Sequence, residues 1–63
     1  MLHKIEQIRS LRDFVEIHRD EKMTYYSLLN AWIRQTGVKV QDADTMDYYL
    51  TLIPMIERRL DAQ

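Results

Sequence analysis

Apolar residues recur at helical spacing in three segments of this 63-residue chain, and this pattern limits the fold more than any other feature. In the first segment, residues 2–20, the residues Ile5, Ile8, Leu11 and Val15 follow one another at intervals of three, three and four positions. Residues at these intervals share one face of an α-helix, so the segment predicts an amphipathic helix from Leu2 to Asp20. One glycine, one proline and 46% hydrophobic residues are typical of an ordered, helix-rich chain.

The second predicted helix covers about Thr24 to Thr36. A tight connection before it is favoured over a bend in one longer helix, because Asp20 and Thr24 can each serve as an N-cap. Gly37, the only glycine, stands where a left-handed residue would end this helix. One broad side of the helix gathers Tyr25, Tyr26, Leu29, Trp32, Ile33 and Thr36.

A third helix is predicted to follow an extended loop at Val38 to Val40, with Asp42 or Asp44 as its N-cap. Its apolar stripe continues through Pro54 without a change of register. A proline inside a helix removes one hydrogen bond and costs about 3 kcal/mol or more. The sequence therefore predicts either a kinked helix or two abutting helices, the second beginning at Pro54. The stripe consists of Met46, Tyr49, Leu50, Ile53, Ile56 and Leu60.

Together these segments predict an all-α fold, a single three-helix domain spanning residues 1–63. A chain of this length buries only about 60% of the surface its unfolded form exposes, so its core is marginal. With no cysteine, extra stability must come from helix packing or from association with another chain. The formal net charge of −1, the short apolar runs and the lack of a signal-peptide stretch favour a cytoplasmic protein without a membrane span.

No combination of residues predicts catalysis, a cofactor or a metal. His18-Arg19-Asp20 matches the first letters of the kinase catalytic loop, but no asparagine follows at the required spacing. The aspartates at positions 42, 44 and 47 lack the glycine and glutamate of a calcium loop, so they are read as caps and solvated charge. His3 and His18 are too far apart for one helical metal face, and His18 is expected to lie half-buried beside Phe14. The chain is therefore predicted not to be an enzyme.

A helix, a short turn and a third helix are loosely the layout of a helix-turn-helix protein. The third helix would present Asp42, Asp44 and Asp47 to the DNA phosphates and repel them. Arg34 and Lys39 alone do not form a basic footprint, so nucleic-acid binding is disfavoured.

Two apolar faces are predicted on the third helix. At about 100° per residue, Tyr48, Leu52 and Met55 lie about 100° to 160° away from the stripe centred on Ile53. Phe14 and Ile17 are similarly displaced from the stripe of the first helix. We expect these five residues to form an interaction surface for a protein partner, most simply a second copy in a homodimer.

The whole chain resembles the small, cysteine-free helical early proteins that lambdoid phages encode between their exonuclease and excisionase genes. The residues that carry the resemblance are the stretch Asp13 to Lys22 and the tyrosine-doublet run Met23 to Arg34. The resemblance implies an accessory protein, in the host cytoplasm, that biases the choice between lysis and lysogeny or interferes with the host cell cycle. It carries over no functional residues.

The leading hypothesis is a non-enzymatic protein-interaction module, a phage regulator that binds a host or phage protein through an apolar helical face. A small DNA-binding regulator with a divergent helix-turn-helix is the first alternative. A self-associating toxin–antitoxin or assembly component is the second.

Overall fold

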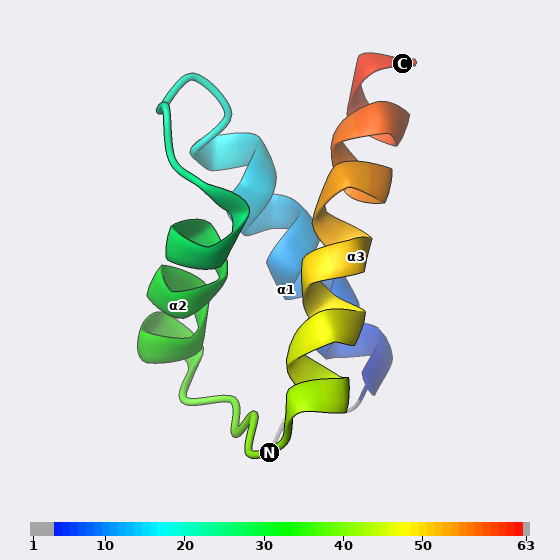
Figure 1. Ribbon diagram of the computed structural model, residues 1–63. Coiled ribbons are helices and arrows are strands. Elements are labelled where there is room, and N and C mark those ends of the chain that lie inside the picture. Colours follow the sequence, from blue (N-terminus) through cyan, green and yellow to red (C-terminus); the bar gives the residue numbers. More distant parts are fainter. Residues whose placement is uncertain (1–3, 63) are drawn as a thin grey trace.

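Three α-helices make up the fold in the computed structural model, which describes residues 4–62. They are α1 (Lys4–Ile17), α2 (Tyr25–Thr36) and α3 (Ala43–Asp61). α1 and α3 run in the same general direction and α2 runs in the opposite direction, with one connection at each end of the molecule (Figure 1). Each helix contacts the other two. The all-α, three-helix prediction is confirmed, while the predicted start of the first helix at Leu2 and the residue His3 lie outside the described residues.

Local capping residues fix the ends of α2 and the start of α3. The Thr24 hydroxyl accepts a hydrogen bond from the Ser27 backbone N–H at 3.1 Å, so α1 and α2 are separate helices. Gly37 adopts the left-handed conformation at φ 71° and donates its N–H to the Ile33 carbonyl at 2.8 Å. The Asp42 carboxylate accepts from the Thr45 N–H at 2.7 Å. Of the two predicted caps for α3, Asp42 is therefore the one used.

The core lies where the three helices meet, and its polar edges are hydrogen-bonded. The indole N–H of Trp32 donates to the Ser10 hydroxyl at 3.1 Å, and the Tyr49 hydroxyl donates to the Gln7 side-chain oxygen at 2.7 Å. Both bonds join α1 to another helix, so they fix how the helices are aligned along one another. They also provide hydrogen-bond partners for the polar groups of the two aromatic side chains. The buried core residues are Leu11, Phe14, Val15, Leu28, Leu29, Trp32, Tyr49, Ile53, Ile56 and Leu60.

The buried face of α1 differs from the predicted stripe. Ile5 was expected to face the core but is 67% exposed, whereas Phe14, expected on an outer face, is 7% exposed and belongs to the core. Phe14 and Val15 follow Leu11 by three and four positions, so the three buried residues also share one helical face. The buried face is therefore shifted toward Phe14 relative to the predicted stripe, and α1 contacts both α2 and α3.

The helix α3 is continuous from Ala43 to Asp61, with Pro54 in its interior. The alternative of two abutting helices that meet at Pro54 is therefore not observed. The loop at Val38 to Val40 is irregular, and both valines are partly buried against the core, as predicted. An ion pair between Arg19 and Asp61 joins the first connection to the end of α3.

Candidate protein-interaction surface

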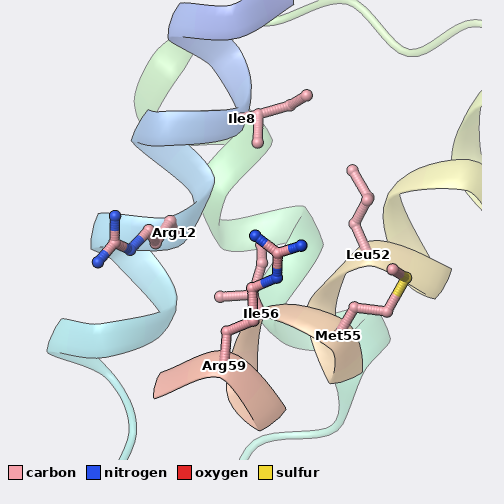
Figure 2. A pocket seen from close by; sticks show the side chains of 6 residues that line it. All are labelled: Ile8, Arg12, Leu52, Met55, Ile56 and Arg59. Atoms are coloured by element: carbon pink, nitrogen blue, oxygen red, sulfur yellow. The ribbon is translucent and has the colours of Figure 1, made fainter. Parts of the chain in front are cut away.

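A groove between α1 and α3 contains two of the predicted surface residues. It has a volume of about 320 Å³, and α3 contributes Leu52 and Met55 to its wall (Figure 2). Met55 is 50% exposed, while Leu52 is partly buried against the core. The complete lining is Ile8 and Arg12 from α1, with Leu52, Met55, Ile56 and Arg59 from α3.

A second, shallower hollow continues along the same two helices toward the N-terminal end of α3. Tyr48, which is 41% exposed, lies there beside Lys4, whose ammonium is 5.3 Å from the centre of the Tyr48 ring. Such a cation–π contact contributes about 0.5 to 1 kcal/mol at an exposed site. Asp44 lines the same hollow. We refer to the groove and this hollow together as the groove face.

The tyrosine beside Tyr48 anchors this face to the core. The Tyr49 ring lies 5.5 Å from the Tyr48 ring and 5.4 Å from the Trp32 ring, measured between ring centres. Burial raises the pKa of the Tyr49 hydroxyl, and the neighbouring Tyr48 raises it further. Tyr49 is therefore a buried core residue, and its ring contacts the exposed ring of Tyr48.

Charge at the groove comes from two arginines, one on each wall. Arg59 extends from α3 into the space between the two helices, near Ile56, whereas the Arg12 guanidinium turns outward from α1 in the view of Figure 2. Within residues 4–62, neither arginine lies within 4.0 Å of a carboxylate. The groove is thus apolar at its floor and basic at its rim.

The other two predicted surface residues are not part of this face. Phe14 is buried, with its ring 4.2 Å from the imidazole of the half-buried His18, as the sequence indicated for that histidine. Ile17 is 75% exposed, but it follows Ile8 by nine positions and so lies about 180° around α1 from the groove. The five predicted residues therefore divide into Tyr48, Leu52 and Met55 on the groove face, Phe14 in the core, and Ile17 on a separate surface.

Sequence reasoning missed the contribution of α1 to this face. Ile8 was read as a core residue, and Arg12 and Arg59 were not connected with the apolar residues of α3. A helical projection of one helix cannot show which residues of another helix will lie beside it. The only available signal was that Ile8 and Arg12, four positions apart, share a side of α1.

The acidic side chains of the described residues are not gathered into a metal site. Among residues 4–62, no three His, Cys, Asp or Glu side chains are grouped so that they could hold a metal ion. Asp42, Asp44 and Asp47 are exposed, and the hydrogen bonds from Thr45 to the Asp42 carboxylate lower the pKa of that group. Over the same residues, no helix is long and apolar enough to cross a membrane.

Comparison with known proteins adds no relative. No protein-family model matches the chain, and no curated protein or solved structure matches it either. The argument for a binding surface therefore depends on the geometry of the groove face itself.

Proposed function

We propose that this protein is a non-enzymatic protein-interaction module that binds a partner protein through the groove face. The observation that carries the proposal is the exposure of Tyr48 and Met55 on either side of Leu52, along one side of α3. These residues occupy positions i, i+4 and i+7, the spacing by which a helix anchors itself against another helix. Tyrosine, methionine and arginine, which all occur here, are enriched at the centres of protein interfaces.

The cellular role follows from the resemblance of residues 13–34 to early phage proteins. It is that of a phage-encoded regulator that acts on a host or phage protein in the host cytoplasm, and so biases lysis against lysogeny or alters the host cell cycle. The resemblance supports the role, whereas the groove face supports the interaction.

DNA binding has weaker support. The exposed carboxylates of Asp42, Asp44 and Asp47 lie in and beside the first turns of α3, where a helix-turn-helix protein would approach the phosphates. Self-association through the groove face is the remaining alternative, and it uses the same apolar residues.

Affinity capture with matched variants tests the proposal. The immobilised chain is exposed to bacterial lysate, and bound proteins and nucleic acid are quantified for the wild type, Met55→Asp and Tyr26→Asp. Met55 is the better target than Leu52, because Leu52 also packs against the core. Tyr26 is a matched control because it is a comparably exposed apolar residue outside the groove.

We expect Met55→Asp to lose a specific protein that the wild type and Tyr26→Asp both retain. Circular dichroism should show the same helical signal for all three chains. Equal capture by Met55→Asp and the wild type would contradict the proposal, as would nucleic acid as the only specific ligand.

A further inference from the structure

We propose that the groove between α1 and α3 binds an acidic, amphipathic helical segment of the partner protein. This proposal rests on the proposed function and adds the chemistry of the partner. It combines two features of one site, an apolar floor and two arginines that have no carboxylate partner among residues 4–62.

The floor defines the apolar part of the partner. Ile8, Leu52, Met55 and Ile56 line the groove from two helices that run side by side. A partner helix that lies along such a groove inserts side chains at helical spacing, and its backbone hydrogen bonds stay internal. An extended strand would need backbone partners from a sheet edge, and the described residues contain no strand.

The rim defines the charge of the partner. Arg59 projects between the helices, and Arg12 is exposed on the opposite wall, from which its long side chain can reach a bound ligand. A guanidinium pairs with a carboxylate through two parallel hydrogen bonds, which is stronger and more directional than a neutral contact. Arg59 also lies in the last turn of α3, where a positive charge interacts favourably with the helix dipole. Arg58 lies in the same turn, so the dipole alone does not explain why an arginine lines the groove.

The distribution of charge over the molecule also favours an acidic partner. The groove face carries three cations, Lys4, Arg12 and Arg59, against the single carboxylate of Asp44, and so has a net charge of +2. The whole chain has a formal net charge of −1. The face is thus basic on an acidic molecule, which favours an acidic partner.

The same charges do not favour the binding of a second copy of the chain to this face. If two copies met in parallel through this face, Arg12 and Arg59 would meet the same two arginines. If they met in antiparallel fashion, the arginines would meet Lys4 and Asp44, whose charges cancel. An acidic partner segment gains from both arginines, whereas a second copy gains from neither arrangement.

The test uses a displayed library of random 16-residue peptides, selected on the full chain. Selected peptides are labelled, and their affinities are measured by fluorescence anisotropy for three proteins. These are the wild type, the double variant Arg12→Glu/Arg59→Glu and the control Arg9→Glu/Arg58→Glu. The control makes the same charge change on the same two helices at exposed arginines that do not line the groove.

We expect the selected peptides to combine carboxylates with apolar residues spaced at i, i+4 and i+7. The groove double variant should bind them at least about tenfold more weakly, as the loss of charge-assisted hydrogen bonds implies, and the control should change the affinity little. A twin peptide in which lysines replace the carboxylates should lose binding to the wild type. Thermal unfolding should confirm that both variants are folded.

Several results would overturn the proposal. They are a failure to select any peptide, selected peptides without acidic bias, or equal losses for the control and the groove variant. Two others are duplex DNA binding that depends on Arg12 and Arg59, and a concentration-dependent dimer that is lost in Met55→Asp.

Lysate capture separates this proposal from the proposed function. A captured protein that is lost with Met55→Asp but retained with Arg12→Glu/Arg59→Glu overturns only the acidic partner. Retention with both variants overturns the interaction surface as well.

Discussion

The two tyrosine doublets of this chain are similar in sequence but differ in what they do. Tyr25 and Tyr26 are the first two residues of α2 and are both exposed, by 44% and 59%. Tyr48 and Tyr49 lie more than one turn inside α3, where Tyr49 is buried and Tyr48 lies on the groove face. Side chains on a helix lean toward its N-terminus, so a residue in the first turn projects past the end of the helix, and Tyr25 reaches α3 through the hydrogen bond of its hydroxyl with Glu57. A residue one turn further in can pack on a neighbouring helix. The two exposed tyrosines thus open their helix, whereas the buried one lies more than one turn inside its own.

Truncating one tyrosine of each doublet should produce the largest contrast. Tyr49→Ala removes a buried ring and should cost about 3 to 5 kcal/mol, as for other buried aromatic residues. This is comparable with the whole stability of such a small domain, so the variant should be largely unfolded by circular dichroism at 25 °C. Tyr26→Ala should change the free energy of unfolding by no more than about 0.5 kcal/mol.

A milder substitution sharpens the same contrast. Tyr49→Phe keeps the ring but loses the hydrogen bond to Gln7, which should cost about 1 kcal/mol in urea denaturation. Similar losses for Tyr49→Ala and Tyr26→Ala would show that the two doublets are not distinguished by burial.

The caps that precede the doublets should differ in their response to pH. Thr24→Ala removes the cap of α2 and should cost about 1 kcal/mol at any pH at which the chain is folded. Asp42→Ala removes the cap of α3. Its effect should depend on pH, because the Asp42 carboxylate accepts a hydrogen bond from Thr45 that weakens when the carboxylate is protonated.

The sign of that dependence follows from the lowered pKa of Asp42. The stabilisation is fully present well above the ordinary aspartate pKa of 3.8, and it is lost as the pH falls through the lower pKa of the folded state. Thermal midpoints measured from pH 7 downward should therefore show Asp42→Ala approaching the wild type in acid, whereas Thr24→Ala stays below it. A constant difference for both variants would contradict this assignment.

The smallest expected effect concerns the exposed doublet. A hydrogen bond to the Glu57 carboxylate, together with its negative charge, raises the pKa of Tyr25 above its ordinary value of 10.0. Glu57→Gln should lower the pKa of Tyr25 toward that value, as followed by the chemical shift of the ring carbon that bears the hydroxyl. The pKa of Tyr49 is raised by burial and should not change, so it serves as the internal control. An unchanged Tyr25 pKa would show that the contact between α2 and α3 at Glu57 does not form in solution.

Short-range signals made much of this fold predictable. Thr24, Gly37 and Asp42 act on backbone groups within four residues of themselves, so the sequence alone locates both ends of α2 and the start of α3, whereas α1 ends at Ile17, before the predicted Asp20. The outer residues of α3, Tyr48, Leu52 and Met55, were also predictable, because their position depends only on the geometry of one helix.

Features that depend on how the helices cross were not predictable. Ile5 and Phe14 both fit an apolar face of α1, and only the position of α2 and α3 decides that Phe14 is buried and Ile5 is exposed. Similarly, Arg12 and Arg59 are 47 positions apart, and nothing in the sequence shows that they line one groove. The exposed apolar residues of α3 were therefore visible in the sequence, whereas the contribution of Ile8 and the charge of the groove were not.

The left-handed backbone conformation of Gly37, at the end of α2, disfavours an L-amino acid at this position. At φ 71°, Gly37 has a backbone conformation that strains an L-amino acid, yet a side-chain carbon placed there would meet no atom within 4 Å. The restriction therefore concerns handedness rather than size. A chain of 63 residues is within reach of chemical synthesis, and a D-alanine at position 37 would fit both the backbone and the open space. It would also reduce the conformational freedom of the unfolded chain, so this mirror-image residue should stabilise a fold that the natural L-alanine would weaken.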